Sequence, residues 1–410
     1  MDPSLCVSRR TRMAEVTDKN DSANYKTQDN LLPIRRFRRI NVDIVPYLKL
    51  MVQKNGSDLF FSTGAPPNLK AEGETRPIGA TPLQPGHVRK LAYGIMSDDQ
   101  IKEFESTLEC NLAVSIAKLG RFRVNVFKQR GDAAMVIRYI KGVIPPVEKL
   151  NLPPILKDLI MEPRGLILVV GSTGSGKSTT LAAMIEHRNQ NKTGHILTIE
   201  DPIEYLYTHK KSVVDQREVG IDTMSYANAL KNAMREAPDV ILIGEIREMS
   251  TMQHAVAYAE TGHLCLSTLH ANNANQALDR IINFFPESAQ NQLYMDLSLN
   301  LKAVISQRLV RGKDGQRLPA VEIMLLSTYV SELIQKGDIH AIKEVMEQGN
   351  ERGMQTFDQS LYNLYKEGRI TLEEALNNAD SRNNLSLRIR LSDNDDLEVP
   401  EGLSMHEDEF

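Results

Sequence analysis

The sequence predicts an α/β protein with two domains, of which the second has a mostly parallel sheet and ends in helices. Three observations lead to this prediction. Short apolar runs alternate with helical stretches in the second half of the chain, a pattern typical of parallel strands covered by helices on both faces. A segment with four prolines in thirteen residues separates that half from a shorter mixed region. Near the C-terminus, apolar residues recur at helical spacing.

The composition is that of a globular protein with a sizeable core. The chain has 410 residues, of which 41% are hydrophobic and 25% charged, enough for two domains and tails. A formal net charge of −4 gives no overall basic surface for nucleic acid. Cys6, Cys110 and Cys265 are widely separated and form no CxxC pair. This spacing argues against a zinc cluster or a disulfide framework and favours a reducing compartment.

The sequence contains no evident membrane span or export signal. No apolar stretch approaches the roughly 18 to 20 residues that a spanning helix needs. The N-terminus also lacks the apolar segment of a secretory signal. We therefore expect a cytoplasmic protein that reaches a membrane only through its partners.

Both ends of the chain have the composition of disordered segments. Residues 1–41 are polar and turn-rich, and they end near the basic run "RRFRR", which predicts a disordered leader or, alternatively, a basic arm. The last eighteen residues carry eight acidic side chains and no Lys or Arg. Because these charges repel one another, we expect residues 381–410 to form an acidic disordered tail.

Residues 42–144 predict a small α/β domain. The segment "VDIVPYLKLMVQKNG" has apolar residues at helical spacing and ends in glycine. It is followed by "SDLFFS", "RFRVNVFKQR" and "AAMVIRYI", whose β-branched and aromatic residues favour strands. The prolines of "GVIPPVEKLNLPP" then interrupt helix and strand alike, and residues 145–154 are expected to form the interdomain linker.

Residues 155–380 predict the second domain. Its expected strands are the apolar runs "LILVVG", "ILTIED", "DVILIGE", "HLCLSTLH" and "AVEIMLL". Its closing helices are indicated by Phe357, Leu361, Leu364 and Tyr365, which fall on one helical face. The capping-box spacing of "TLEE" at residues 371–374 marks the start of a further helix.

The run "GSTGSGKSTT" follows the first of these strands and matches the phosphate-loop pattern GxxxxGK[ST]. Glycines allow the backbone N–H groups to surround phosphates, and the helix that follows presents its positive end. Lys177 would reach the β- and γ-phosphate oxygens, and Ser178 would ligate Mg²⁺. The predicted nucleotide-binding residues are Gly171, Ser172, Thr173, Gly174, Ser175, Gly176, Lys177, Ser178 and Thr179.

Acidic residues follow two other predicted strands. Glu245 ends "DVILIGE", so its carboxylate would emerge at the edge of the sheet where ligands of such folds bind. Glu200, Asp201 and Glu204 follow the strand "ILTIE" in the same way. Glu245 is our first choice for the carboxylate that acts on the attacking water or on the magnesium ion, and the sequence does not separate these two duties. A solvated strand end is the alternative.

Histidines and arginines supply further candidates. His263 and His270 lie at the two ends of the strand "LCLSTL", and each could contact the γ-phosphate or serve a structural role. Arg123, Arg130 and Arg138 lie on or beside strands of the first domain. Their guanidinium groups could stabilise transferring charge at a nucleotide, although arginine on a strand commonly serves solubility.

These residues together resemble the PilT/PilU branch of the type II/IV secretion ATPase superfamily, the motors of type IV pilus retraction. The resemblance runs from about Val42 to Ala379. In the first domain it rests on "SDLFFSTGAPPNLKAEG" and the arginine-bearing strands. In the second it rests on the phosphate loop, "TIEDPIEY", "APDVILIGEIRE" and "ETGHLCLSTLHANNANQALDRIINFFP".

The resemblance implies a fold, an activity and partners. It implies a PAS-like first domain, a RecA-like ATPase domain, and a ring of six identical chains that hold ATP and Mg²⁺ between the domains. The ring would act on an inner-membrane pilus platform protein from the cytoplasmic face of that membrane. The residues to which it assigns nucleotide-contacting or arginine-finger roles are Glu200, Glu204, Glu245, His263, His270, Arg123, Arg130 and Arg138.

Two departures refine the choice within the superfamily. Extension and secretion motors usually carry a four-cysteine zinc element and a longer N-terminal domain, which this chain lacks. PilT-type motors have an "AIRNLIRE"-like helix after their "EIM" strand, whereas here "EIMLLS" is followed by "TYVSELIQKGD", without either arginine. This difference and the acidic tail favour the PilU type, which assists a PilT retraction ATPase.

Three alternatives stay open at this point. The chain could be a stand-alone motor of the PilT type, or a nucleotide-binding subunit that regulates a PilT ring without hydrolysis. The intact phosphate loop and Glu245 argue against the latter. A nucleic-acid translocase would need a basic channel, which the net charge does not support, and we expect no nucleic-acid partner.

Overall fold

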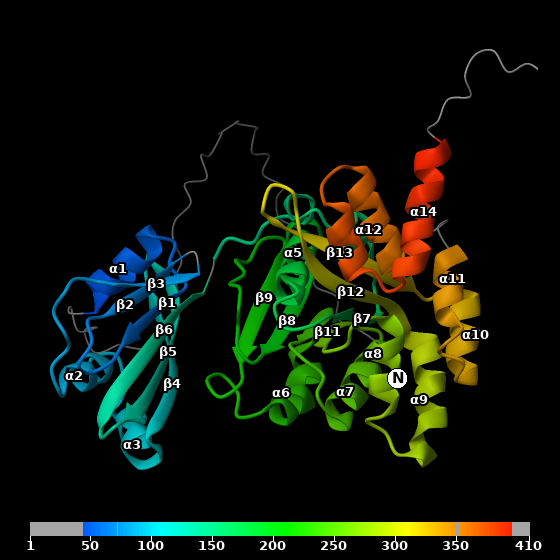
Figure 1. Ribbon diagram of the computed structural model, residues 1–410. Coiled ribbons are helices and arrows are strands. Elements are labelled where there is room, and N and C mark those ends of the chain that lie inside the picture. The colour runs from blue at the N-terminus through cyan, green and yellow to red at the C-terminus, as the bar shows by residue number, and fades with distance from the viewer. Residues whose placement is uncertain (1–43, 72, 141, 349–352, 396–410) are drawn as a thin grey trace, which may run out of the picture.

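The computed structural model describes residues 44–71, 73–140, 142–348 and 353–395. These residues form two α/β units connected by an extended segment (Figure 1). The expected leader, residues 1–41, and the end of the expected tail, residues 396–410, lie outside the described residues. Within the described part of the chain, no helix combines the length and apolar character needed to cross a membrane.

The first domain is an antiparallel sheet packed against helices. The strand order is β3-β2-β1-β6-β5-β4, and the neighbouring strands all pair antiparallel. The elements are α1 (Val45–Gln53), β1 (Asp58–Phe61), β2 (Asn68–Ala71), β3 (Glu74–Pro77), α2 (His87–Tyr93), α3 (Asp98–Thr107), β4 (Glu109–Ile116), β5 (Gly120–Gln129) and β6 (Asp132–Ile140).

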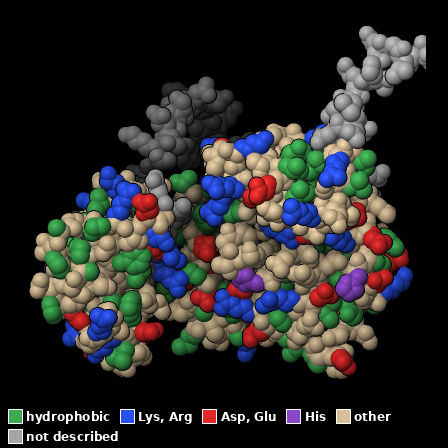
Figure 2. Space-filling view, in the orientation of Figure 1, with side chains coloured by type: hydrophobic (Ala, Val, Ile, Leu, Met, Phe, Trp, Pro, Cys, Tyr) green, Lys and Arg blue, Asp and Glu red, His purple; other side chains and the backbone are tan. Residues whose placement is uncertain are grey.

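In strand β5, apolar and basic residues alternate between the two faces of the sheet. Phe122, Val124 and Val126 are buried in the core of the first domain. Successive side chains of a strand point to opposite faces, so Arg121 and Arg123 lie on the face away from that core. Figure 2 shows basic side chains gathered on the side of the first domain that faces the second.

The connection contains the 3-10 helix η1 (Val147–Leu150) and leads into α4 (Ile155–Met161). Val147 and Leu156 of these elements are buried in one cluster with strands of the second domain. The end of the connection is therefore anchored on the second domain.

The second domain is a seven-stranded sheet in the order β13-β12-β7-β11-β10-β8-β9. Strands β12 and β13 pair antiparallel, whereas the other neighbours are parallel. The strands are β7 (Gly165–Val170), β8 (Gly194–Glu200), β9 (Ser212–Glu218), β10 (Val240–Ile243), β11 (Leu264–Leu269), β12 (Leu301–Arg311) and β13 (Arg317–Leu325).

Helices cover both faces of this sheet, as Figure 1 shows. Every residue of β7, β10 and β11 is buried, which explains why these strands are continuous apolar runs in the sequence. The helical elements between the strands are α5 (Lys177–Asn191), α6 (Tyr226–Ala233), η2 (Met234–Glu236), α7 (Met249–Glu260), α8 (Ala274–Ile282) and α9 (Glu287–Asn300).

The C-terminal part is helical, as expected. Its helices are α10 (Thr328–Lys336), α11 (Ile342–Gln348), α12 (Phe357–Lys366), α13 (Leu372–Asn378) and α14 (Arg382–Asp395). Phe357, Leu361 and Leu364 are buried as the spacing predicts, and Tyr365 packs beside them. Thr371 caps α13 by accepting a hydrogen bond from the N–H of Glu374.

Helix α14 corrects the expectation that residues 381–410 are disordered throughout. Leu385 and Ile389, one helical turn apart, are buried against the α12 cluster. Burial of these two side chains stabilises the helix. The acidic run begins only at the end of α14, so charge repulsion does not oppose most of its length.

Candidate nucleotide-binding site

The phosphate loop connects the buried strand β7 to helix α5, as predicted. Gly171 and Gly176 have φ angles of 153° and 93°, where L side chains are strained. A Cβ on Gly171 would lie 2.5 Å from the carbonyl oxygen of Gln307, and one on Gly176 would lie 2.8 Å from the Gln307 side-chain nitrogen. Strand β12 therefore supports the loop from behind, so closely that only glycine fits.

Lys177 folds back over the loop that precedes it. Its ammonium group donates hydrogen bonds to the carbonyl oxygens of Gly171 at 2.8 Å and Ser172 at 3.0 Å. Burial lowers the pKa of Lys177, and the charges of Glu245 and Glu204 oppose this change. The ammonium group is thus held at the loop, within the field of two carboxylates.

A pocket of about 250 Å³ opens beside Lys177. It is formed by the phosphate loop together with the segments that follow β8, β10 and β11, at the carboxyl edge of the sheet. The structure brings into it nine residues that the sequence predicted: Thr173, Gly174, Lys177, Ser178, Glu200, Asp201, Glu204, Glu245 and His270. Gly176 and Thr179 line a second pocket of about 420 Å³ on the other side of the loop, against η1 and the β12–β13 hairpin.

The carboxylate of Glu245 contacts two side chains, those of His270 and Arg247. Its Oε1 lies 3.2 Å from Nε2 of His270, and its Oε2 accepts a hydrogen bond from Nε of Arg247 at 2.7 Å. Burial lowers the pKa of His270, as does the charge of Lys177, whereas Glu245 raises it. These contacts fix the carboxylate in the wall of the pocket.

Glu200 lines the same pocket and ends β8. Its Oε1 accepts a hydrogen bond from the hydroxyl of Thr198 at 2.7 Å and faces the side-chain amide of Gln216 at 3.4 Å. Burial raises the pKa of Glu200 to about 7, and the neighbouring Glu204 acts in the same direction. Glu200 therefore holds a proton part of the time near neutral pH.

We define the acidic loop as residues 201–209, between β8 and β9. Side-chain hydrogen bonds hold this loop in place. Gln216 of β9 donates to the carbonyl oxygen of Tyr205 at 2.8 Å and accepts from the N–H of Tyr207 at 2.9 Å. The hydroxyls of Tyr205 and Thr179 lie 2.9 Å apart. The acidic loop is thereby tied to both β9 and the helix that follows the phosphate loop.

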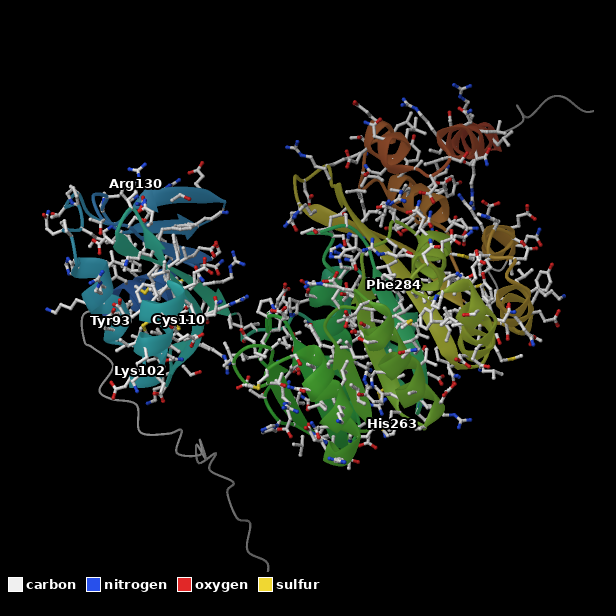
Figure 3. The ribbon with its side chains drawn as sticks, turned by 90° about the horizontal axis from the view of Figure 1, so that it is seen from below. Tyr93, Lys102, Cys110, Arg130, His263 and Phe284 are labelled. Atoms are coloured by element: carbon white, nitrogen blue, oxygen red, sulfur yellow. The ribbon has the colours of Figure 1, made fainter. Side chains whose placement is uncertain are left out.

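Four of the eight predicted catalytic residues do not line this pocket within one chain. His263 lies at the amino end of β11, the edge of the sheet away from the phosphate loop, and contacts Thr261 (Figure 3). Arg130 lies in the turn between β5 and β6, at one end of the first domain (Figure 3). Arg138 forms an ion pair with Asp58 at 2.7 Å, and Arg123 lies 3.9 Å from Glu218. Their proposed contacts with nucleotide stay predictions.

Several residues of this region were not predicted from the sequence. Thr180 donates a hydrogen bond to the side chain of Gln307 at 2.6 Å, which fixes α5 on β12. The other residues missed are Arg121, Thr198, Tyr205, Gln216, Glu218 and Arg247. The polar residues of "DQRE" within an otherwise alternating strand are the signal that could have indicated Gln216 and Glu218.

The donor set suits magnesium only in the presence of phosphate. Ser178 and Glu245 line the same pocket, but the described residues contain no group of three or more His, Cys, Asp or Glu side chains placed to hold a metal ion. Mg²⁺ is commonly bound through one or two protein oxygens together with substrate phosphates, and the residues present fit that arrangement.

The comparisons with known proteins agree with this geometry. Residues 110–390 match the family described as type II/IV secretion system protein. The chain is 53% identical to the type IV pilus ATPase PilU of Pseudomonas aeruginosa over 87% of its own length and 95% of that protein. It is 41% identical to the type IV pilus retraction ATPase PilT of the same organism, over 82% of this chain and 97% of that one.

A solved structure supports the fold in three dimensions. The crystal structure of the pilus retraction motor PilT with bound ADP superposes with a TM-score of 0.79 at 42% identity, covering 84% of this chain and 99% of that one. The predicted α/β fold class, with an N-terminal domain and an ATPase-like domain that ends in helices, is confirmed. On the family match and the extent of identity to full-length relatives, the chain belongs to the type II/IV secretion system protein family.

Proposed function

We propose that this chain is a magnesium-dependent ATPase that powers or assists the retraction of type IV pili. The observation that carries the proposal is the single pocket that joins Lys177, Ser178 and Glu245 at the carboxyl edge of a parallel sheet. The names of the similar proteins, a pilus ATPase and a pilus retraction ATPase, support the choice of process.

The residues divide the work on the triphosphate. The N–H groups of residues 171–178 surround the β- and γ-phosphates, and Lys177 exchanges its two carbonyl partners for phosphate oxygens. Mg²⁺, when bound, would neutralise charge on the phosphates. Ser178 would hold that ion, and Glu245 would orient the attacking water, because His270 and Arg247 fix its carboxylate in the pocket that Lys177 lines.

Glu200 has a different role in this proposal. With a pKa of about 7, Glu200 is not fully ionised near neutral pH, in contrast to a carboxylate that is paired with an arginine. In its protonated form it can donate a hydrogen bond to a phosphate oxygen. We assign the water-orienting role to Glu245 and a phosphate-side role to Glu200 and Glu204.

We further propose the assembly and the location. The chain forms a homo-hexamer at the cytoplasmic face of the inner membrane, where it acts with a PilT retraction ATPase on the pilus platform protein. The higher identity to PilU than to PilT supports the accessory role. The alternative is a stand-alone retraction motor. It would be favoured if this chain restored twitching motility in a strain without PilT.

The test is phosphate release from ATP by the purified protein, alone and mixed with its cognate PilT. Lys177→Ala should lower turnover by about 100-fold or more, because it removes the charge that binds the transferring phosphate. The matched control is Lys231→Ala, which removes an exposed lysine from α6 and should leave turnover unchanged. Normal turnover in Lys177→Ala would contradict the site assignment. Nucleotide binding without phosphate release, alone or in the mixture, would instead support the regulatory subunit.

A further inference from the structure

Two ion pairs connect the first domain to the second, and Glu218 is the acidic partner in both. Nη2 of Arg121 lies 3.8 Å from Oε2 of Glu218, and Nε of Arg123 lies 3.9 Å from Oε1. Both arginines come from the face of β5 that points away from the core of the first domain, whereas Glu218 ends strand β9. The Glu218 side chain is 2% exposed, so this carboxylate is buried at the junction of the domains.

The contact is close but incompletely satisfied. Both distances exceed those of charge-assisted hydrogen bonds. Oε2 of Glu218 and Nε of Arg121 are buried without a hydrogen-bond partner among the described residues. Burial raises the pKa of Glu218, and the two arginines only partly offset this effect. A guanidinium group held in this way would gain hydrogen bonds by moving to a phosphate, which it can bind in a bidentate manner.

Glu218 borders the pocket through the acidic loop. The backbone of Ile203 lowers the pKa of the Glu218 carboxyl group, and the residues on either side of Ile203, Pro202 and Glu204, line the pocket. The carbonyl oxygen of Glu200 also accepts a hydrogen bond from the N–H of Val219 at 2.9 Å. Arg121 and Arg123 therefore rest beside the pocket wall, without lining the pocket themselves.

We propose that Glu218 is a resting-state receptor for Arg121 and Arg123, and that the γ-phosphate of bound ATP competes with it for these two guanidinium groups. The proposal rests on the proposed function, because it requires a triphosphate in the pocket. A ligand shifts such an equilibrium only through its differential affinity for the two states. The γ-phosphate supplies this difference, since ADP offers no oxygens at that position. ATP binding then detaches the first domain from Glu218 and draws its arginines toward the nucleotide.

The variant Glu218→Gln removes the charge of this side chain. The amide keeps the shape of the residue and a side-chain oxygen, but it lacks the charge that holds the arginines. We expect a non-hydrolysable ATP analogue to bind full-length Glu218→Gln about 3- to 10-fold more tightly than wild type, because the competing state is weakened. ADP affinity should change little. Equal tightening of both nucleotides, or no tightening of the triphosphate, would overturn the proposal.

Two further variants complete this test. Glu236→Gln removes a carboxylate that pairs with Arg217 at 2.6 Å, within the second domain, and should leave both affinities unchanged. In the triple variant Glu218→Gln, Arg121→Gln, Arg123→Gln, the gain in triphosphate affinity should disappear. A gain that persists there would mean that Glu218 acts on the nucleotide through its charge alone, which contradicts the proposal.

A measurement without nucleotide tests the resting contact independently of catalysis. Spin labels attached through Lys102→Cys in α3 and Lys231→Cys in α6, in a Cys6→Ser background, report the separation of the two domains. We expect a broader distance distribution in Glu218→Gln than in the otherwise wild-type chain. An unchanged distribution would overturn the receptor role even if the chain hydrolyses ATP. If the distance distribution broadens but the chain binds no ATP, the receptor role of Glu218 stands and the proposed ATPase function is wrong.

Discussion

Glu322 is a buried carboxyl group outside the nucleotide pocket. It lies on β13 and is 3% exposed. Its Oε1 accepts hydrogen bonds from the N–H of Ala274 at 2.7 Å and from the hydroxyl of Ser306 at 2.8 Å. Because Ala274 begins α8, Glu322 anchors the helix that follows the His270 segment. The pKa of the Glu322 carboxyl group therefore differs between the folded and the unfolded chain.

Burial raises the pKa of Glu322 from 4.5 to about 7. The folded chain therefore favours the protonated form, and the associated stability is complete below about pH 4.5 and lost as the pH rises through about 7. This difference corresponds to at most about 3 kcal/mol. We expect Glu322→Gln to gain unfolding free energy relative to wild type as the pH is raised from 5 to 8, measured by urea denaturation.

The control for this experiment is Glu344→Gln, which changes an exposed carboxylate of α11. Its difference from wild type should be small at every pH. A Glu322→Gln difference that is the same at pH 5 and pH 8 would show that the carboxyl group titrates equally in the folded and unfolded chains.

At the level of elements, strand β9 positions the acidic loop. Gln216 donates to the carbonyl oxygen of Tyr205 and accepts from the N–H of Tyr207, and a primary amide supplies the required donor and acceptor together. Its nitrogen also faces Glu200. Displacement of the loop would move Glu204 and alter the surroundings of Glu200.

We expect Gln216→Leu to lower kcat for ATP hydrolysis by about 10- to 100-fold, the size of effect that follows from a small misplacement of catalytic groups. Gln216→Glu keeps an acceptor for the N–H of Tyr207 but loses the donor to Tyr205. It also adds a negative charge beside Glu200, which should raise the pKa of Glu200 and so shift to higher pH the loss of activity that follows deprotonation of Glu200. The matched control is Asp215→Asn, whose side chain contacts His195 instead. Unchanged kcat and pH profile in both Gln216 variants would exclude the positioning role.

Elements with a local sequence signal were predictable, and elements defined by distant partners were not. The phosphate loop and strands β7, β10 and β11 were predicted because buried parallel strands and glycine-rich turns are visible in a few consecutive residues. Strand β9 was missed because, at the edge of the sheet, only some of its side chains are buried. Strand β12 was missed because it carries polar residues, such as Gln307, that bond to the phosphate-loop helix. The Arg121–Glu218 contact joins two domains, and no local pattern reveals it.

At the scale of the whole molecule, one chain does not bring all of its predicted arginines to the site. Arg130 and Arg138 do not line the pocket of their own chain, and neither pairs with Glu218 as Arg121 and Arg123 do. A ring in which domains from different chains meet would supply such groups to a neighbouring nucleotide.

We therefore expect ATP turnover per chain to depend on protein concentration. Dilution below the point at which the assembly dissociates should lower it at least several-fold, because the neighbouring arginines are lost and removal of such a group costs about 10³-fold in related phosphoryl transfers. Phosphate release and mass photometry on the same dilution series provide the measurement. Constant turnover per chain across a range in which the measured mass falls would show that one chain is catalytically sufficient.

The two domains differ in the range of sequence that each needs in order to fold. The core of the first domain is assembled from residues between Ile44 and Ile137, one continuous stretch. Strand β7, in contrast, pairs with β12, so the sheet under the phosphate loop needs residues as late as 306. During synthesis on the ribosome, domains generally fold as units with the N-terminal one first. The first domain can thus fold before the residues of the nucleotide site have all been synthesised. Its arginines are then already positioned on β5 and β6 when the second domain folds.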